Sequence, residues 1–447
     1  MTTQHHRKPG SALRNIAMVL LFVVFVLGLT AAVQVFRRDV VLMLPAEHEA
    51  RLARRDSPDN AFTTVAYAIK QLPVKPGDEK GKPSYAPDRW WDERRGKDAQ
   101  RREKASPFEP ESSFSKLDEP SLAKLCWIDR PDGDPALMEY IRGCQSAGRA
   151  LHIGLESPFC ICPDSPRFHN RFYDGSLMQL GRSVAALGCV QFSESPSLDS
   201  LQPLIDAIRL ARLLSREDDL LGVSQGIEGP ALQQIRHLAV RTGQATLLAQ
   251  ALNALGPGYL PRHDVLRTLW LDLDDQIGAQ KSDRGVSSYQ RRIFRTFAFS
   301  HDIQRLVAAM KDRKDELLTL ADHTPPEMVK WICGNIDPGR PPGDLGKNER
   351  RIVMALHRAA ELSGDFVATQ IVLALETCKA ETGQYPSTLD ALAPKYIAVL
   401  PRDPYTLAPF GYTLAKGAYT IYSYGEDLAD NGGDPVRDRI IIGGGTV

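Results

Sequence analysis

Residues 382–412, TGQYPSTLDALAPKYIAVLPRDPYTLAPFGY, and residues 419–435, YTIYSYGEDLADNGGDP, decide the fold of the C-terminal part of the chain. Two aromatic and β-branched runs, Phe410–Leu414 and Ala418–Ser423, are separated by the short segment 415–417, and this pattern is typical of a β-hairpin. Glycine and proline divide the rest into short turns. The sequence therefore predicts a small antiparallel sheet.

A helix is predicted directly before these segments, over residues 361–382, and Gly383 is placed to end it. Its apolar residues recur at three- and four-residue spacing and so fall on one face. These residues are Val367, Ile371, Leu375 and Cys378. A second, short helix is predicted to begin at Ser387 or Thr388 as N-cap, with Leu389 and Leu392 pointing inward. The C-terminal part should thus be α+β.

The order of these elements resembles the C-terminal domain of the major pseudopilin of bacterial type II secretion. Gly383, Tyr385 and Pro386 follow the helix, and Leu400–Tyr405 reads LPRDPY where that family usually has Leu-Pro-Lys-Asp-Pro-Trp. The series closes with YSYGED and NGGD, at 422–427 and 431–434. The resemblance covers residues 348–447 and implies a pseudopilin-like α+β head.

The segment 425–438 concentrates oxygen-bearing side chains on a turn in which Gly432 and Gly433 are free to take positive φ. Calcium takes six to eight oxygen ligands in a flexible shell. The resemblance implies a calcium loop, although Leu428 stands where the family has glycine and the acidic spacing is shifted. The alternative is a plain turn, because Asp, Asn and Gly are common turn residues. The candidate ligands are Asp427, Asp430 and Asp434, then Glu426, Asn431 and Asp438.

An uncharged apolar run, IAMVLLFVVFVLGLTAAVQVF, occupies residues 16–36 and is long enough to cross a bilayer. We interpret it as a single-pass anchor; a cleaved signal peptide is the alternative, but the run exceeds the usual apolar core of such peptides. The flanking Lys and Arg do not settle the orientation. Because the pseudopilin-like head belongs outside the cytoplasm, we expect an inner-membrane protein with a periplasmic body.

The N terminus departs from the pilin pattern. Residues 14–18 lack the glycine that precedes a prepilin cleavage site, and no acidic residue lies between Ser11 and Arg38. In pilins the membrane helix continues directly into the head, whereas here more than 300 residues intervene between the span at 16–36 and the head at 348–447. The chain should therefore not polymerise as an ordinary pseudopilin.

The central part of the chain reads as successive amphipathic helices after a charged, Pro-rich linker that contains Trp90 and Trp91. These helices predict a bundle or a short α-solenoid that binds other proteins or acts as a spacer. The expected organisation is a cytoplasmic tail at 1–15, the anchor at 16–36, a juxtamembrane helical segment at 37–72, the linker at 73–117, a helical domain at 118–340 and the head at 348–447.

Five helical faces support the helical domain, and the first is expected to be capped by Asp199 or Ser200. The faces are formed by residues 201–214, by residues 232–240, by residues 247–255 with a stop at Gly256, by residues 265–277 and by residues 303–317.

The composition gives no sign of a nucleic-acid partner, because 55 basic and 55 acidic residues leave a net charge of zero. The chain also lacks a Walker A loop, a dinucleotide-binding fingerprint, a Gly-x-Ser-x-Gly elbow and a His-Glu-x-x-His motif. We therefore expect no enzymatic activity and no cofactor besides calcium.

The sequence contains three weaker candidate sites. Cys160, Cys162 and His169 offer three zinc ligands without a fourth. One to three disulfides are compatible with seven cysteines in an oxidising compartment, most readily at Cys160 and Cys162. His263-Asp264 and His301-Asp302 suggest a metal-dependent hydrolase but lack the converging ligands that such a site needs.

Two functions follow from these observations. The first is an assembly or interaction component of the bacterial envelope, whose head contacts pseudopilins or secretion-platform proteins. The second is a helical envelope scaffold or sensor that carries a borrowed pseudopilin module, because a fold does not fix a function. A metal-dependent hydrolase in the helical domain is a third and weaker hypothesis.

Overall fold

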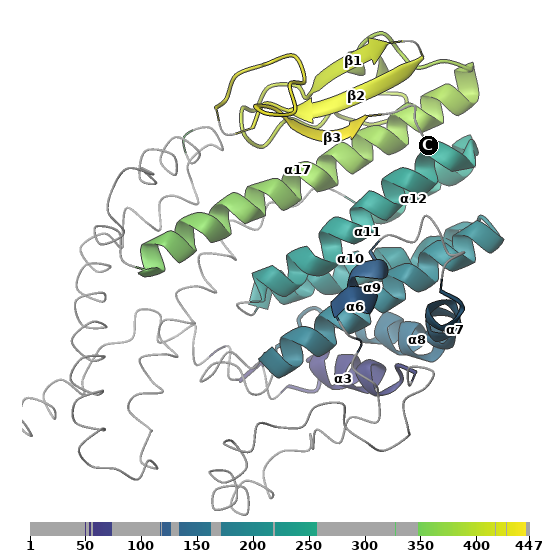
Figure 1. Ribbon diagram of the computed structural model, residues 1–447, viewed down its shortest axis with the longest axis vertical. Helices are drawn as coiled ribbons and strands as arrows, with labels where there is room; N and C mark the ends of the chain where they lie inside the picture. Colours follow the sequence, from purple (N-terminus) through teal and green to yellow (C-terminus); the bar gives the residue numbers. More distant parts are fainter. Residues whose placement is uncertain are drawn as a thin grey trace, which may run out of the picture.

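The computed structural model is mainly helical and carries one three-stranded sheet near the C terminus (Figure 1). The predicted fold class, mainly α with a C-terminal α+β part, is confirmed at this level. Among the residues described, no helix is long and apolar enough to cross a membrane. The structure describes residues 57–73, 119–126, 134–161, 171–217, 220–256, 347–415, 417–425 and 427–443, with single positions 50, 53, 54, 117 and 327.

Several predicted segments lie outside the described residues. They are the tail and anchor at 1–36, nearly all of the linker at 73–117, and the helices expected at 265–277 and 303–317.

One end of the molecule is built from short helices, drawn at the bottom of Figure 1. α3 (Phe62–Lys70) packs against α8 (Gln145–Gly154), and α7 (Pro135–Gly143) and α8 both contact α9 (Arg171–Glu194). α6 (Glu119–Lys124) is linked to the start of α7, because Lys124 lies 3.0 Å from Asp134, the N-cap of α7. The buried Asn60 side chain accepts hydrogen bonds from the backbone N–H groups of Phe62 and Ile161 and donates one to the Ile161 carbonyl oxygen. It therefore ties the start of α3 to a segment 101 residues away.

Four longer helices form the middle of the molecule: α9 (Arg171–Glu194), α10 (Leu198–Glu217), α11 (Leu221–Thr242) and α12 (Ala245–Leu255). The apolar faces predicted for α10 and α12 are buried, whereas the face predicted for α11 is buried at Leu232 and Ile235 and only half-buried at Leu238 and Val240. Glycines let these helices approach closely, since a Cβ at Gly188 would lie 2.9 Å from the Leu204 backbone nitrogen and one at Gly181 would lie 2.6 Å from Ile227.

Helix boundaries in this region partly match the prediction. α12 ends at Leu255, and Gly256, the predicted stop, follows it as the C-cap with φ 71°. The predicted cap of the preceding long helix is wrong, because α10 begins at Leu198 and Asp199 and Ser200 belong to its first turn. Ser197 takes the cap position instead, and the Ser197 and Ser200 hydroxyls each accept the other residue's backbone N–H at 3.1 and 3.0 Å. This reciprocal arrangement corresponds to a capping box.

α17 (Lys347–Thr382) is the longest of the described helices and begins well before the predicted start at residue 361. It packs against α11 and α12 on one side, and the sheet lies on its other side (Figure 1). Every residue from Ala368 to Cys378 is buried. A helix buried on all sides must be enclosed by other elements, so α17 connects the helical part of the molecule to the C-terminal sheet.

The sheet has the order β1-β2-β3, with both pairs antiparallel. β1 (Gly411–Ala415) and β2 (Ala418–Ser423) form the predicted hairpin, in which Gly417 takes φ 76°. β3 (Arg439–Gly443) was not predicted, although its Ile440-Ile441-Ile442 run carries a strand signal. The predicted short α-helix is a 3₁₀ turn, η2 (Leu389–Leu392), and the Thr388 side chain does not cap it.

Replacing Gly188 by Ala tests the close packing of α9 on α10. The new methyl group would meet backbone rather than a flexible side chain, so we expect the free energy of unfolding to fall by about 1–3 kcal/mol. Gly222→Ala is the matched control, because no atom lies within 4 Å of a Cβ placed there. Chemical denaturation monitored by circular dichroism should show a lower midpoint for the first variant alone.

Candidate functional site

The acidic segment 425–438 joins β2 to β3 and is organised around Asp438. The Asp438 side chain is 4% exposed and accepts hydrogen bonds from the backbone N–H groups of Asn431, Gly433 and Asp434 at 3.3, 2.7 and 3.1 Å. Gly432 and Gly433 have φ 71° and 82°, as the sequence predicted. Positive φ at these two residues turns the chain around the carboxylate.

The outer acidic side chains of the same segment bond to neighbouring loop groups. Asp427 accepts from the Ala429 N–H at 3.0 Å and from the Asn431 side-chain amide at 2.9 Å. Asp430 accepts from the Gly432 N–H at 2.9 Å and from the Tyr422 hydroxyl at 3.0 Å. Burial, together with the Asp430 carboxylate, raises the pKa of Tyr422 to about 12. The tyrosine therefore stays neutral and remains a donor to the loop.

As they lie, these carboxylates do not converge on one centre. Among the described residues, no three His, Cys, Asp or Glu side chains are placed to hold a metal ion, and Glu426 lies outside the described part. Asp434 accepts from the Val436 N–H at 3.0 Å. A cation could bind these carboxylate oxygens only if their hydrogen bonds to loop N–H groups were broken. Calcium at Asp427, Asp430 and Asp434 therefore stays a prediction that requires the loop to rearrange.

Leu428 is held in the left-handed region, with φ 59°. This conformation costs a residue with a Cβ roughly 1–2 kcal/mol, a cost that glycine avoids. The position is the one where the resembling family has glycine. The replacement of glycine by leucine therefore has a physical cost, because the loop keeps a backbone conformation that suits glycine.

Asp403 organises residues 403–406 and joins them to the end of β2, a role that the sequence pattern did not predict. Its side chain is 0% exposed. One carboxylate oxygen accepts from the Tyr405 N–H at 3.0 Å and the Ser423 hydroxyl at 2.9 Å, and the other accepts from the Tyr424 N–H at 3.0 Å and the Thr406 hydroxyl at 3.2 Å. A buried charge needs such complete pairing. The aspartate of the LPRDPY segment therefore fixes this loop to the end of β2.

The sheet is attached to α17 through a second buried carboxylate, Glu376. Both of its oxygens accept from the Tyr385 hydroxyl, at 2.9 and 3.1 Å, and one also accepts from the Tyr419 hydroxyl at 2.9 Å. Burial raises the pKa of Glu376 above its usual range, while the tyrosine hydroxyls act in the opposite direction. The two rings meet edge to face at 4.7 Å. α17, the turn after it and β2 are thus joined at one point.

A group of arginines joins the head to the helical layers. Arg236 of α11 is buried and donates to the Thr369 hydroxyl of α17 at 2.9 Å, and Arg439 of β3 pairs with Asp365 of α17 at 2.8 Å. Arg212 of α10 bonds Glu228 at 3.1 Å and lies 3.8 Å above the Phe366 ring. Burial lowers the pKa of Arg236 and raises that of Glu228. These bonds link α10, α11, α17 and β3. They therefore fix the position of the head on the helices.

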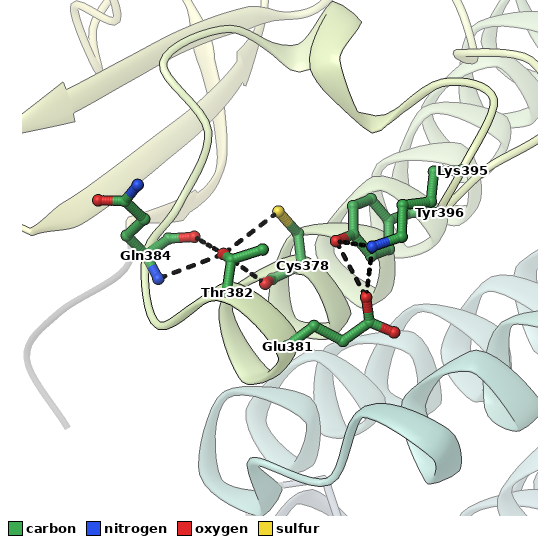
Figure 2. Close-up of polar contacts among 6 residues, drawn as sticks. All are labelled: Cys378, Glu381, Thr382, Gln384, Lys395 and Tyr396. Atoms are coloured by element: carbon green, nitrogen blue, oxygen red, sulfur yellow. Dashed lines mark hydrogen bonds and ion pairs between the residues drawn. The ribbon is translucent and has the colours of Figure 1, made fainter.

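The C-terminal end of α17 is closed by a smaller polar cluster (Figure 2). The Thr382 hydroxyl donates to the carbonyl oxygen of Cys378 at 2.8 Å or of Gln384 at 2.9 Å. It accepts the Gln384 N–H at 3.4 Å and lies 3.9 Å from the Cys378 sulfur. These bonds shape the turn after the helix.

The other half of this cluster is exposed. Lys395 lies 2.7 Å from Glu381 and 2.9 Å from the Tyr396 hydroxyl (Figure 2). These contacts lower the pKa of Glu381 and raise that of Lys395. Exposed pairs of this kind add little to stability, so the cluster positions the segment after η2 and offers no reactive group.

The weaker sites are only partly described. Cys160 is buried, whereas Cys162, His169 and both His-Asp pairs lie outside the described residues. The Cys189 thiol donates to Gln234 at 2.8 Å. Burial raises the pKa of the Cys144 thiol to about 12, so this thiol stays protonated.

Comparison of the chain with known protein families, with curated proteins and with solved structures finds no match. The resemblance to the pseudopilin head therefore stands on the quoted residues.

Replacing Asp403 tests its role in the head. Asp403→Ala leaves four donors without their acceptor, so we expect the head to lose roughly 3 kcal/mol of stability. Asp403→Asn should lose part of this, because an amide keeps one acceptor oxygen. Asp390→Ala, at an exposed position on η2, is the control and should have little effect. Equal melting of all three variants would exclude an organising role for the buried carboxylate.

A calcium titration tests the loop. If calcium binds, the full chain in detergent should melt at a higher temperature with millimolar calcium than with chelator, because an ion that binds only the folded state stabilises it. Asp430→Ala and Asp434→Ala should abolish the difference, and Asp390→Ala should retain it. Identical melting with calcium and with chelator would mean that the loop is held by its own hydrogen bonds.

Proposed function

We propose that this chain is a single-pass protein of the bacterial inner membrane whose periplasmic body presents a pseudopilin-like head as an interaction surface. Its role is assembly or scaffolding in the envelope and not catalysis, and its partners are pseudopilins or secretion-platform proteins rather than nucleic acid. Calcium binding by the 425–438 loop belongs to this proposal. The proposal rests on the LPRDPY, YSYGED and NGGD segments and on the apolar run at 16–36.

The observation that carries the interaction role is the enclosure of α17. Its residues Ala368–Cys378 are buried between the sheet and helices α11 and α12. A pilin-type subunit needs the free stem of its long helix to pack against neighbouring subunits. Since this stretch is already covered, it is unavailable for such packing, which supports a component that contacts a fibre or platform without entering it.

The attachment of the head also favours the second candidate, a helical scaffold that has incorporated the pseudopilin module. Arg236 and Arg439 bind α17 from opposite sides, through Thr369 and Asp365. A head fixed in this way acts together with the helices rather than as a mobile domain. Under this alternative, the binding surface spans both parts and the head has no pseudopilin partner.

Site-specific photocrosslinking distinguishes the two candidates. A photoreactive amino acid is placed at Val436 or Val399, which are 89% and 78% exposed on the head, in full-length chain co-expressed with a type II secretion system. We expect a crosslink to a pseudopilin or platform protein from the head positions, because a docked partner would cover them. Position 153, on the helical body, serves as the matched control.

The absence of a crosslink from the head would overturn the first candidate. If the chain is folded and membrane-embedded but neither head position crosslinks to a secretion component, the scaffold alternative is favoured. A chain recovered from the soluble fraction would contradict the anchor itself.

A further inference from the structure

Two large apolar side chains are exposed on the helical layers, at the end of the molecule opposite the sheet. Tyr67 of α3 is 57% exposed and Ile153 of α8 is 62% exposed. The other exposed large apolar side chains among the described residues all belong to the head. Single exposed apolar residues are ordinary, but neighbouring ones form a patch that calls for a partner.

The packing of α3 on α8 places Tyr67 and Ile153 at similar levels along the helix pair. A Cβ at Gly154, at the end of α8, would lie 3.2 Å from Thr64, and the Ala61 N–H donates to the Phe159 carbonyl oxygen at 3.0 Å. The end of α8 therefore lies beside the start of α3, and the two helices run antiparallel. With Thr64 level with Gly154, Tyr67 is level with Leu151. At about 1.5 Å per residue, Ile153 then lies only about 3 Å further along the axis.

Exposed charged side chains also lie on or beside these two helices. Lys70 and Arg149 are exposed on the same two helices. Asp59 and Glu156 are also exposed, close to the ends of these helices. Long basic side chains can lie over an apolar surface while their charged groups reach lipid phosphates. An apolar pair flanked by Lys and Arg is the composition of a surface that sits at the headgroup level of a bilayer.

Chain connectivity keeps this surface within reach of the predicted anchor. The predicted span ends at Phe36, and α3, which begins at Phe62, is the first described helix after it. At most ~3.4 Å per residue, residues 37–61 hold α3 within roughly 85 Å of the bilayer. Such a tether gives a weak lipid contact a high effective concentration. The sheet lies at the far end of the layers (Figure 1).

We infer that the α3–α8 face around Tyr67 and Ile153 rests on the lipid headgroups, so that the head is held away from the membrane. This inference rests on the proposed membrane anchoring and specifies how the body is oriented on its anchor. The contact is mainly apolar, because acidic and basic groups on this face nearly balance. It should therefore survive moderate salt.

Depth-dependent quenching tests the inference on the full chain in nanodiscs of phosphatidylcholine and phosphatidylglycerol. A fluorescent amino acid is encoded at position 67 or 153, with position 436 on the head as the matched control. Nitroxide-labelled lipid should quench positions 67 and 153 roughly threefold more than position 436, because interfacial side chains reach the boundary between the headgroups and the acyl chains. Ile153→Asp should reduce the quenching at position 67, while Val436→Asp should not.

Three other outcomes would overturn the inference. Equal quenching at all positions in chain retained by the nanodiscs would leave the anchor intact and show that the face is not on lipid. Protection of position 153 from aqueous iodide without lipid quenching would assign the face to a protein partner. Chain that is not retained by the nanodiscs would contradict the proposed anchoring together with this inference. Circular dichroism of each labelled chain confirms that it is folded.

Discussion

The structure depends on the complete burial of residues Ala368–Cys378 of α17 between the helices and the sheet. Apolar residues such as Ile371 and Leu375 are 0% exposed, and each contributes about 1.5–3 kcal/mol by leaving water. The same enclosure obliges every polar group on the helix to find a partner. Gln370 donates to the Gly256 carbonyl oxygen at 2.7 Å, and Thr377 donates to the Leu373 carbonyl oxygen at 2.7 Å. The Thr377 bond stays within α17, whereas the Gln370 bond fixes the end of α12 against it.

These bonds make the C-terminal head part of the larger body. Glu376 fixes the position of β2, Asp365 that of β3 and Thr369 that of α11. Removing a hydroxyl partner of the buried Glu376 or Arg236 would leave a charged group unsatisfied, which costs about 1–3 kcal/mol or more. The surface formed by the 425–438 loop therefore has a fixed direction relative to the helices, and a partner that binds it meets an oriented surface.

Sequence patterns could predict the elements that carry a local signal. The hairpin at 411–423, the faces of α10 to α12 and the stop at Gly256 all follow from periodicity or from glycine placement. The start of α17 could not be predicted in this way, because it lies in a polar stretch, KNERR, without an apolar stripe. β3 was missed because its isoleucines follow a long acidic turn. Asp403 was missed because its role depends on Ser423 and Tyr424, which are distant in sequence.

The role of the acidic loop at 425–438 also depends on contacts that the sequence does not reveal. Composition alone favours a cation, because six oxygen-bearing side chains fall within 426–438. The fold, however, turns Asp438 inward to bind three N–H groups and gives Asp430 to Tyr422. Carboxylates used in this way already have their charge compensated by dipoles. Ion binding must therefore contribute more free energy than the hydrogen bonds that it replaces. Leu428 adds backbone strain to the turn that would have to move. Any calcium site here would be weaker than a preformed one, and its occupancy would vary with calcium concentration.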